Sequence, residues 1–372
     1  MLLRRLLFQV HVWLGVLTGL YVVIVCVSGA ALVFRIDLQR ALHPRLFTAS
    51  ASGPLAEPVA VMESVSRSYP RHQLSGVDAP TTLRPTYLAY VTSEAEFRTV
   101  LIDPVSTAVL GELPEHTAIR TLQDLHYNLL GGRTGRTING IGAFAILILC
   151  ATGLVIWWPG ATAWRRGLVV DFSRDGPPSP SLWRTSRRVL WELHRAVGIW
   201  SVAFIAMAAI TGLSFAFPAG FRGFVNRMSP ITVDRSPRST LPAGAGKQVP
   251  SWSRMVDRAR SYTSGRPVAR VVLPFGERGA FLVMFADRSP TPAGSELTPI
   301  YLDQYTGERL AGTATARTWG DAVMSRMSPL HVGGVGGQAG RVLWFVLGLS
   351  PAVLFVTGLM VWWRRVVRPR LS

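Results

Sequence analysis

The chain has 372 residues, of which 49% are hydrophobic and only 16% charged, and its mean hydropathy of +0.29 argues against a purely soluble enzyme. Its net charge of +18 is carried almost entirely by arginine, since Lys247 is the only lysine. A basic chain can bind nucleic acid, but apolar runs of about 20 residues fit a lipid bilayer better, so no nucleic-acid partner is expected. Cys26 and Cys150 lie far apart in apolar runs, which excludes a disulfide framework and a CxxC metal site.

Four segments are apolar and long enough to cross a bilayer core about 30 Å thick, which takes about 20 helical residues. They are residues 8–34, 138–158, 195–217 and 342–363. The first is too long for a signal peptide, and a near copy of it starts at residue 194, far from any terminus. The sequence therefore predicts an α-helical membrane protein with four transmembrane helices.

Arginines predict the orientation, because positive charge concentrates on the cytoplasmic side of membrane proteins. They cluster at the amino terminus, between the second and third spans, and after the fourth: Arg4, Arg5, Arg165, Arg166, Arg174, Arg184, Arg187, Arg188, Arg364, Arg365, Arg368 and Arg370. The tandem tryptophans 157–158 and 362–363 mark the cytoplasmic ends of the second and fourth spans. Both termini are then cytoplasmic, and the two long connecting segments face the other side.

Each of these two external segments predicts a small α+β domain, because an amphipathic helix precedes alternating strands. In the first, the helix is expected near 56–67 and strands near 85–92 and 97–103. In the second, a helix near 252–262 precedes strands over 268–273, 280–285 and 299–303.

The chain contains an internal repeat. His11-Val-Trp-Leu-Gly15 matches His194-Arg-Ala-Val-Gly198, and Ser28-Gly29 follows the first histidine at the offset at which Thr211-Gly212 follows the second. Leu125-His126 matches Leu330-His331, each followed at equal offsets by Gly-Gly, Gly-Arg and Thr-Gly-Leu. The external hairpin 103–110 matches 303–310. Two parallel repeats of span, external domain and span are expected to pair about a pseudo-two-fold axis along the membrane normal.

The expected organisation follows from this repeat. Its parts are a first transmembrane helix (1–36), an external domain (37–120), a histidine segment with the second helix (121–160), a basic cytoplasmic loop (161–190), a third helix (191–217), a second external domain (218–325), a second histidine segment with the fourth helix (326–365) and a tail (366–372).

Four of the seven histidines occupy matched places at span ends, where a polar ring is costly and by default functional. Symmetry pairs His11 with His194, and His126 with His331. Two facing neutral imidazoles suit the axial positions of an iron macrocycle, whereas zinc would have a half-filled tetrahedral site. The remaining histidines have no counterpart and are expected to be ordinary surface residues: His43, His72 and His116.

Four arginines are candidates for pairing with haem propionates. Arg136 and Arg341 follow the external histidines at equal offsets, and Arg5 and Arg195 lie near the cytoplasmic ones. The alternative for each is an orienting or solvent-facing charge.

The motifs His11-x-x-x-Gly15, Ser28-Gly29, Thr211-Gly212-Leu and Asp303-Gln-Tyr-Thr-Gly307-Glu resemble the PepSY-associated transmembrane helix proteins, and among them the FoxB-type ferric-siderophore reductases. The resemblance covers nearly the whole chain except the cytoplasmic loop and tail. It implies a bacterial inner-membrane protein with periplasmic PepSY-like domains and b-type haems, here two. It further implies electron transfer from the cytoplasmic side to siderophore-bound Fe(III) in the periplasm. The first hairpin lacks the usual Gly-Glu, so the first external domain is expected to have drifted furthest.

Two other functions stay open. One is a non-redox protein whose external domains bind a peptide, a siderophore or a protease. The other is a siderophore permease, which is disfavoured because only Pro351 interrupts a span. No Gly-x-Gly-x-x-Gly follows a predicted strand, so flavin or nicotinamide would belong to a partner. The electron donor is then a reductase docking on the arginine-rich loop, or a quinol.

Overall fold

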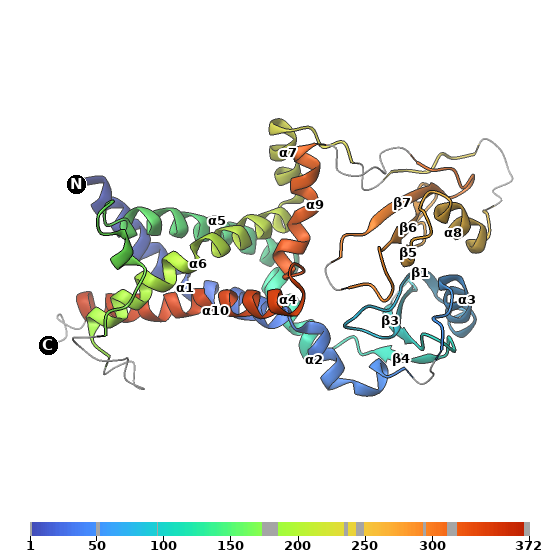
Figure 1. Ribbon diagram of the computed structural model, residues 1–372, viewed down its shortest axis with the longest axis horizontal. Coiled ribbons are helices and arrows are strands. Elements are labelled where there is room, and N and C mark those ends of the chain that lie inside the picture. Colours follow the sequence, from blue (N-terminus) through green and yellow to red (C-terminus); the bar gives the residue numbers. More distant parts are fainter. Residues whose placement is uncertain are drawn as a thin grey trace. The chain divides into compact units, whose positions relative to one another are not determined.

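Four long helices account for the apolar segments of the chain (Figure 1). In the computed structural model, which describes residues 2–49, 53–94, 96–172, 185–233, 237–242, 249–292, 295–310 and 318–367, each is long and apolar enough to cross a membrane. They are α1 (Leu2–Leu32), α5 (Gly132–Trp157), α6 (Arg187–Ala216) and α10 (Gly337–Trp362). The four predicted spans are confirmed as helices. Of the predicted cytoplasmic arginines, Arg174, Arg184, Arg368 and Arg370 lie outside the described residues.

Contacts divide the chain into two units. The helical unit comprises Met1–Phe34, Ala118–Gly223 and Met327–Ser372, and the sheet unit comprises Arg35–Thr117 and Phe224–Arg326.

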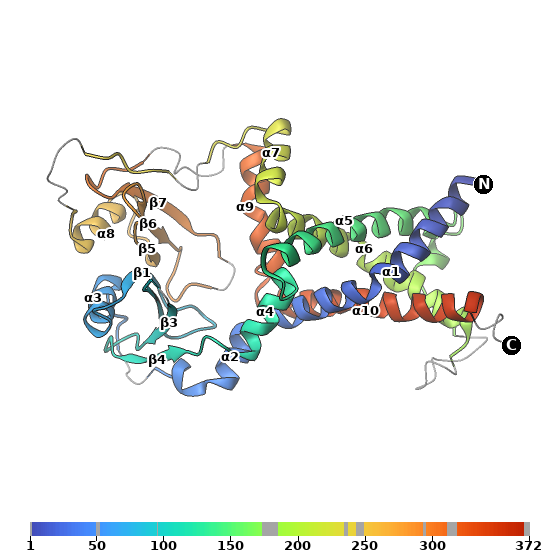
Figure 2. The ribbon, with the colours of Figure 1, turned by 180° about the vertical axis from the view of Figure 1, so that it is seen from behind.

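Within the helical unit, α1 packs against α5 and α10, and α6 packs against the same two helices (Figure 2). Small and branched apolar residues fill the centre of this bundle: Val22, Ala143, Ile146, Ile205, Ala209 and Leu213. Large apolar side chains such as Leu17 and Trp200 point outward and are exposed, as expected of a surface that meets lipid rather than water. Cys26 and Cys150 are free thiols that pack against the same centre.

Two short helices lead into spans. Helix α4 (Ala118–Asn128) packs against α1 and α5 and turns sharply into α5, with positive φ angles at Leu129, Leu130 and Gly132. Helix α9 (Trp319–Val332) leads into α10 in the same way, with positive φ at Gly333, Gly336 and Gly337. Glycine adopts this left-handed conformation at little cost, which explains Gly132, Gly336 and Gly337 in the matched Gly-Gly pairs, whereas Gly131 has an ordinary φ of −106°.

The sheet unit holds one antiparallel sheet of seven strands in the order β4-β3-β2-β1-β5-β6-β7. The strands are β1 (Gln73–Asp78), β2 (Tyr87–Thr92), β3 (Phe97–Ile102), β4 (Val109–Leu113), β5 (Val268–Val272), β6 (Ala280–Phe285) and β7 (Thr298–Asp303). The prediction of a separate domain in each external segment therefore requires correction. Pairing of β1 with β5, at Gly76 with Val272 and at Asp78 with Arg270, joins both segments. It satisfies the backbone groups that two isolated sheets would leave open at their edges.

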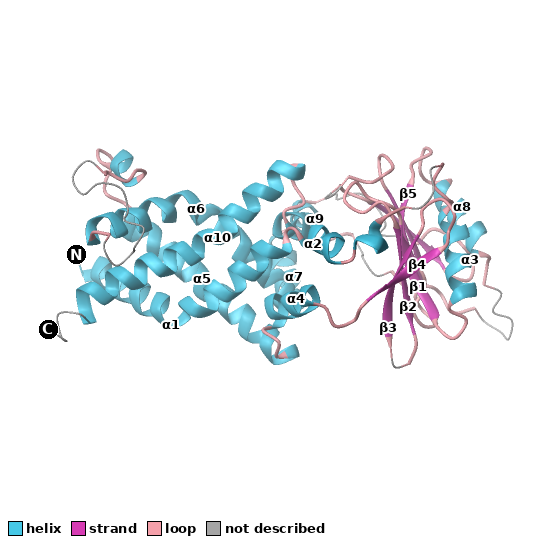
Figure 3. Ribbon diagram, turned by 90° about the horizontal axis from the view of Figure 1, so that it is seen from below, coloured by secondary structure: helices cyan, strands magenta, loops and turns pink. Residues whose placement is uncertain are grey.

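Helices α3 (Pro58–Ser68) and α8 (Trp252–Arg260), both predicted, cover one face of this sheet (Figure 3). Alternate strand residues such as Tyr87, Ala89 and Val91 join the helices in a single core that spans both segments. The remaining described helical elements are α2 (Arg35–Leu42), α7 (Pro218–Met228), 3-10 turns over Pro44–Phe47 and Trp164–Gly167, and a π-helical turn over Trp363–Val367.

The matched hairpins have the same geometry in both segments. Asp103 Oδ1 accepts hydrogen bonds from the backbone N–H groups of Val105 and Ser106, and Asp303 Oδ1 accepts the equivalent pair from Tyr305 and Thr306. In the first hairpin Thr107, with φ of 61°, occupies the left-handed position that Gly307, with φ of 71°, occupies in the second. The first segment thus keeps the turn without its glycine.

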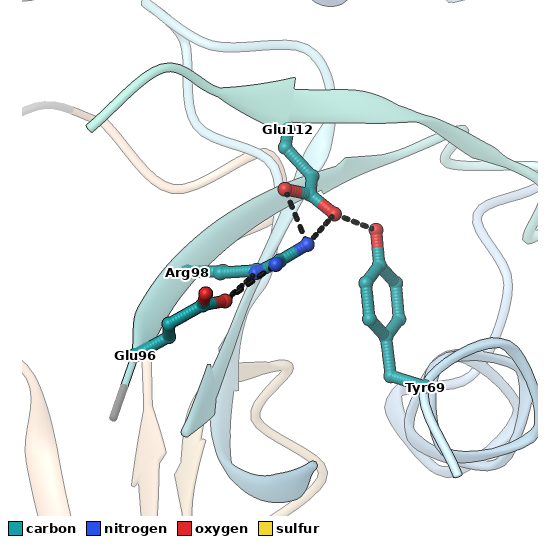
Figure 4. A network of polar contacts seen from close by, with 4 residues as sticks. All are labelled: Tyr69, Glu96, Arg98 and Glu112. Atoms are coloured by element: carbon teal, nitrogen blue, oxygen red, sulfur yellow. Dashed lines mark hydrogen bonds and ion pairs between the residues drawn. The ribbon is translucent and has the colours of Figure 1, made fainter. Parts of the chain in front are cut away.

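A polar network lies on strands β3 and β4, at the edge of the sheet (Figure 4). Glu112 accepts a hydrogen bond of 2.9 Å from the Tyr69 hydroxyl and one of 3.1 Å from Arg98, which also donates to Glu96 at 2.8 Å. Burial, together with Glu112, raises the pKa of Tyr69 to about 12, so the phenol remains a donor. Charged side chains on an edge strand oppose pairing with another chain.

Candidate functional site

The four matched histidines lie in two pairs within the helical unit. The rings of His11 in α1 and His194 in α6 have centroids 6.3 Å apart and stand at 89° to one another. The rings of His126 in α4 and His331 in α9 have centroids 5.9 Å apart at an angle of 38°. The structure brings together the same partners that the repeat predicts.

Each ring is held through Nδ1 by a Ser/Thr-Gly dipeptide in another helix of the same half of the chain. His11 Nδ1 lies 2.9 Å from Thr152 Oγ1, and His331 Nδ1 lies 2.8 Å from Thr211 Oγ1. These hydroxyls donate to carbonyl groups one turn earlier in their own helices, so their oxygen atoms accept from the imidazoles. Nδ1 is therefore the donor in both rings.

The other two rings bond to a backbone carbonyl as well as to a hydroxyl. His126 Nδ1 lies 2.9 Å from the Val25 carbonyl and 3.3 Å from Ser28 Oγ. His194 Nδ1 lies 2.9 Å from the Leu354 carbonyl and 3.1 Å from Thr357 Oγ1.

A carbonyl only accepts, so Nδ1 carries the proton in these two rings as well. All four Nε2 atoms consequently present a lone pair. Among the described residues, no hydrogen bond to any of these Nε2 atoms is found.

The glycine of each dipeptide gives the ring room against the helix backbone. A Cβ atom at Gly29 would lie 2.6 Å from His126 Cε1, and one at Gly358 would lie 3.0 Å from His194 Cε1. At the equivalent glycines, an added Cβ atom would lie 3.3 Å from His11 Cε1 at Gly153 and 3.8 Å from His331 Cε1 at Gly212. In the sequence, these dipeptides stood out only as landmarks of the repeat. Their equal offsets were the signal that could have identified them as the residues that contact the histidine rings.

Burial favours the neutral form of the two histidines outside the spans. It lowers the pKa of His126, and it lowers that of His331 to about 4, with the neighbouring His126 as a second cause. Both rings are thus uncharged near neutral pH, which is the form that binds metals.

A family model for the PepSY-associated TM region matches residues 8–365 of the chain. The chain belongs to this family. No curated protein matches it. With four helices able to cross a membrane, this PepSY-associated protein is a multi-pass membrane protein.

The histidine pairs of this PepSY-associated protein fit an iron macrocycle better than a bare metal ion. An imidazole nitrogen binds a transition metal at about 2 Å, so two rings on opposite sides of one iron have centroids roughly 6 Å apart. Both observed separations agree with this value. Among the described residues, no cluster of three or more His, Cys, Asp or Glu side chains could hold a metal, so a four-coordinate zinc site finds no support there.

The predicted propionate arginines lie in different surroundings. Arg341 is 5% exposed, donates to the Val33 carbonyl at 3.2 Å and lies over the Phe34 ring at the end of α1. Arg195 lies over the Trp191 ring and donates to the Val169 carbonyl at 3.4 Å.

Arg5 and Arg136 are exposed. An arginine outside the predicted set, Arg4, donates to the Ile156 carbonyl at 2.8 Å near the end of α5. Propionate binding by Arg5, Arg136, Arg195 and Arg341 stays a prediction.

The three unmatched histidines all lie in the sheet unit. His116 is exposed, His43 precedes the 3-10 turn, and the half-buried His72 ring stands against Tyr69. The structure therefore brings only the four matched histidines together.

Proposed function

We propose that this protein carries electrons across the bacterial inner membrane through two b-type haems and reduces siderophore-bound Fe(III) in the periplasm, as FoxB-type reductases do. The observation that carries the proposal is the repeated site itself. Two histidine pairs have the separation expected for axial ligands, each ring has its Nδ1 occupied, and each Nε2 is left with a lone pair.

The spacing of the pairs supports a path across the bilayer. His11 is paired near one end of α1, and Ser28, which contacts His126, lies seventeen residues further along that helix. At about 1.5 Å per residue, this separates the two sites by roughly 25 Å, close to the thickness of the hydrocarbon core.

The arginine distribution supports the direction. By the positive-inside rule, it supports a cytoplasmic side for the His11–His194 pair and a periplasmic side for the His126–His331 pair and for the external segments.

The chain's own residues have three tasks in this proposal. The Nε2 atoms of each pair would hold the haem iron, while the Ser/Thr hydroxyl groups fix the rings and would strengthen them as ligands by accepting a hydrogen bond from Nδ1–H. Burial within the bundle keeps the imidazoles of His126 and His331 neutral. When bound, haem supplies the one-electron chemistry, and one electron converts each Fe(III) to Fe(II). The electron donor remains a cytoplasmic reductase or a quinol.

Reduction across a sealed vesicle tests this function. The protein is reconstituted with reductant inside and a ferric siderophore outside, and Fe(II) is trapped by a chelator outside. We expect chelated Fe(II) with the wild type and with the His72→Ala control, and none with His11→Ala or His331→Ala. Siderophore binding without reduction and without a Soret band would instead favour the non-redox binding function.

A further inference from the structure

The carboxyl end of α4 is closed by a side chain of the span that follows it. Asn139 Nδ2 donates to the His126 carbonyl at 2.7 Å and to the Tyr127 carbonyl at 3.3 Å. Carbonyl groups in the last turn of a helix have no partner within that helix, so these bonds satisfy acceptors that would otherwise be open. The turn beyond them is strained, because Leu129 and Leu130 have φ angles of 51° and 60°, which residues with a Cβ atom disfavour. Asn139 therefore holds the histidine helix next to a strained turn.

Tyr21 in α1 fixes the orientation of the Asn139 amide. Because the His126 carbonyl can only accept, the amide nitrogen must face α4, and Oδ1 then faces α1. The Tyr21 hydroxyl donates to this Oδ1 at 2.7 Å and also lies 2.9 Å from the Asn139 carbonyl. A Cβ atom at Gly142 would overlap the Tyr21 ring, so this glycine lets the ring lie against α5. Tyr21 thus holds the amide in the orientation in which it donates to α4.

The second half of the chain has a pair of side chains at the same two positions. Ten residues after the first histidine of each half stand Tyr21 and Phe204. Thirteen residues after the second histidine stand Asn139 and Trp344. The Phe204 and Trp344 rings are in edge contact, with centroids 5.6 Å apart, and Trp344 Nε1 donates to the Leu330 carbonyl at 2.7 Å. In each half, a residue of the first span therefore contacts a donor of the second span that bonds to the histidine helix.

We propose that Tyr21 and Phe204 are positioning residues for the two histidines carried by the short helices α4 and α9. Each fixes the orientation of a neighbouring donor, and that donor in turn holds the carbonyl at, or next to, the histidine. The proposal rests on the proposed function only where it predicts an effect on haem, because the positioning of α4 and α9 does not need a bound group.

The two halves differ in the chemistry of this contact. Removing the Tyr21 hydroxyl leaves Asn139 Oδ1 without its donor, so the amide can rotate and its bond to the His126 carbonyl weakens. At Phe204 the contact is ring packing, so the shape of the side chain decides instead. A shift of α4 moves His126 relative to its own acceptor, the Val25 carbonyl, and thereby changes the ring as a ligand.

Hydrogen exchange tests the positioning without haem. Amide exchange of residues 118–130, which contain α4, is followed by mass spectrometry on the full-length protein in lipid nanodiscs. Tyr21→Phe should speed this exchange about fivefold, the change expected from losing one hydrogen bond, and should leave α9 unchanged. The matched control Thr18→Val removes a hydroxyl that donates within α1, to the Leu14 carbonyl, and should change neither helix.

A double variant separates positioning from a general loss of stability. Asn139→Leu removes the group through which Tyr21 acts, so adding Tyr21→Phe should change the exchange little further, whereas independent effects would add. In the haem-loaded protein, Tyr21→Phe should shift the midpoint potential of the haem at the His126–His331 pair and leave the other haem unchanged.

Phe204→Leu provides a second test if the Tyr21 variants do not fold. It should speed the exchange of α9 and leave α4 unchanged. Unchanged exchange of α4 in Tyr21→Phe, or equal acceleration of α4 and α9 in either variant, would overturn the proposal. Faster exchange of α4 alone in a protein that binds no haem would uphold the positioning role and contradict the proposed function instead.

Discussion

The two histidine pairs use the same local motif on different supports. His11 and His194 belong to the long helices α1 and α6, whereas His126 and His331 belong to the short helices α4 and α9 that precede spans. The short helices have additional tethers, since Asn139 donates to the His126 carbonyl and Trp344 donates to the Leu330 carbonyl, both at 2.7 Å. All four rings are held by a neighbouring helix, and the two short helices are in addition joined by hydrogen bonds to the span that follows.

The largest expected effect comes from removing ligands, which tests whether the pairs are independent. His331→Ala should remove one haem or convert it to high spin, and adding His126→Ala should change little more, because the two residues act as one unit. His331→Ala combined with His11→Ala should abolish both haems. The number of haems per chain and the high-spin and low-spin bands of the absorption spectrum, measured for each variant, show which haem is lost or converted. If His126→Ala and His331→Ala left two low-spin haems, the pair would be structural, and His43, His72 and His116 would be examined next.

Glycine-to-alanine substitutions should show where a histidine ring packs tightly against the neighbouring glycine and where it packs loosely. Gly29→Ala places a Cβ atom 2.6 Å from His126 Cε1, so the ring or helix must shift, and we expect partial loss of one low-spin haem. Gly212→Ala leaves 3.8 Å to His331 Cε1 and serves as the matched control with near-normal spectra. Equal spectra for the two variants would show that haem binding does not depend on the distance between the glycine and the histidine ring.

Removing the hydroxyl of the dipeptide should have a smaller, position-dependent effect. Losing such an outer-shell partner typically lowers metal affinity about 10–100-fold. Thr152→Val should weaken haem retention at the His11–His194 pair more than Thr357→Val does, because His194 keeps a 2.9 Å hydrogen bond to the Leu354 carbonyl, whereas the Leu149 carbonyl beside His11 makes no contact of that quality. Haem dissociation into apomyoglobin measures this order. A larger effect of Thr357→Val would contradict the assigned hydrogen bonds.

The smallest effect is expected from removing one of the hydrogen bonds by which Asn139 and Trp344 hold the short helices. Trp344→Phe keeps an aromatic ring but removes one hydrogen bond, worth about 1 kcal/mol. We expect a modest shift of midpoint potential confined to the His126–His331 pair, measured by redox titration. Phe215→Leu, which alters a ring contact with His331 but removes no hydrogen bond, is the control for local packing. A shift at the other pair would show that the tether does not act locally.

The spans and the histidine partners were predictable because both depend on periodicity and on matched offsets within one chain. The single sheet was not, because β1 contains Gly76 and Asp78, which are poor strand formers, and its partner β5 lies nearly 200 residues away. The hydrogen bonds to Thr152 and Thr211 depend on how the helices pack against one another, and in the sequence only the equal offsets of the Ser/Thr-Gly dipeptides pointed to them. Thr107 in a left-handed conformation shows that a turn can persist after its signature residue is lost.

Counting haems on the purified wild-type protein tests the central claim most directly. A pyridine haemochrome assay against protein concentration, with low-temperature electron paramagnetic resonance, gives the number of b-type haems and their axial ligands. The two histidine pairs predict two low-spin, bis-imidazole haems per chain. A chain purified without haem from haem-replete cells, or with one haem only, would contradict the account.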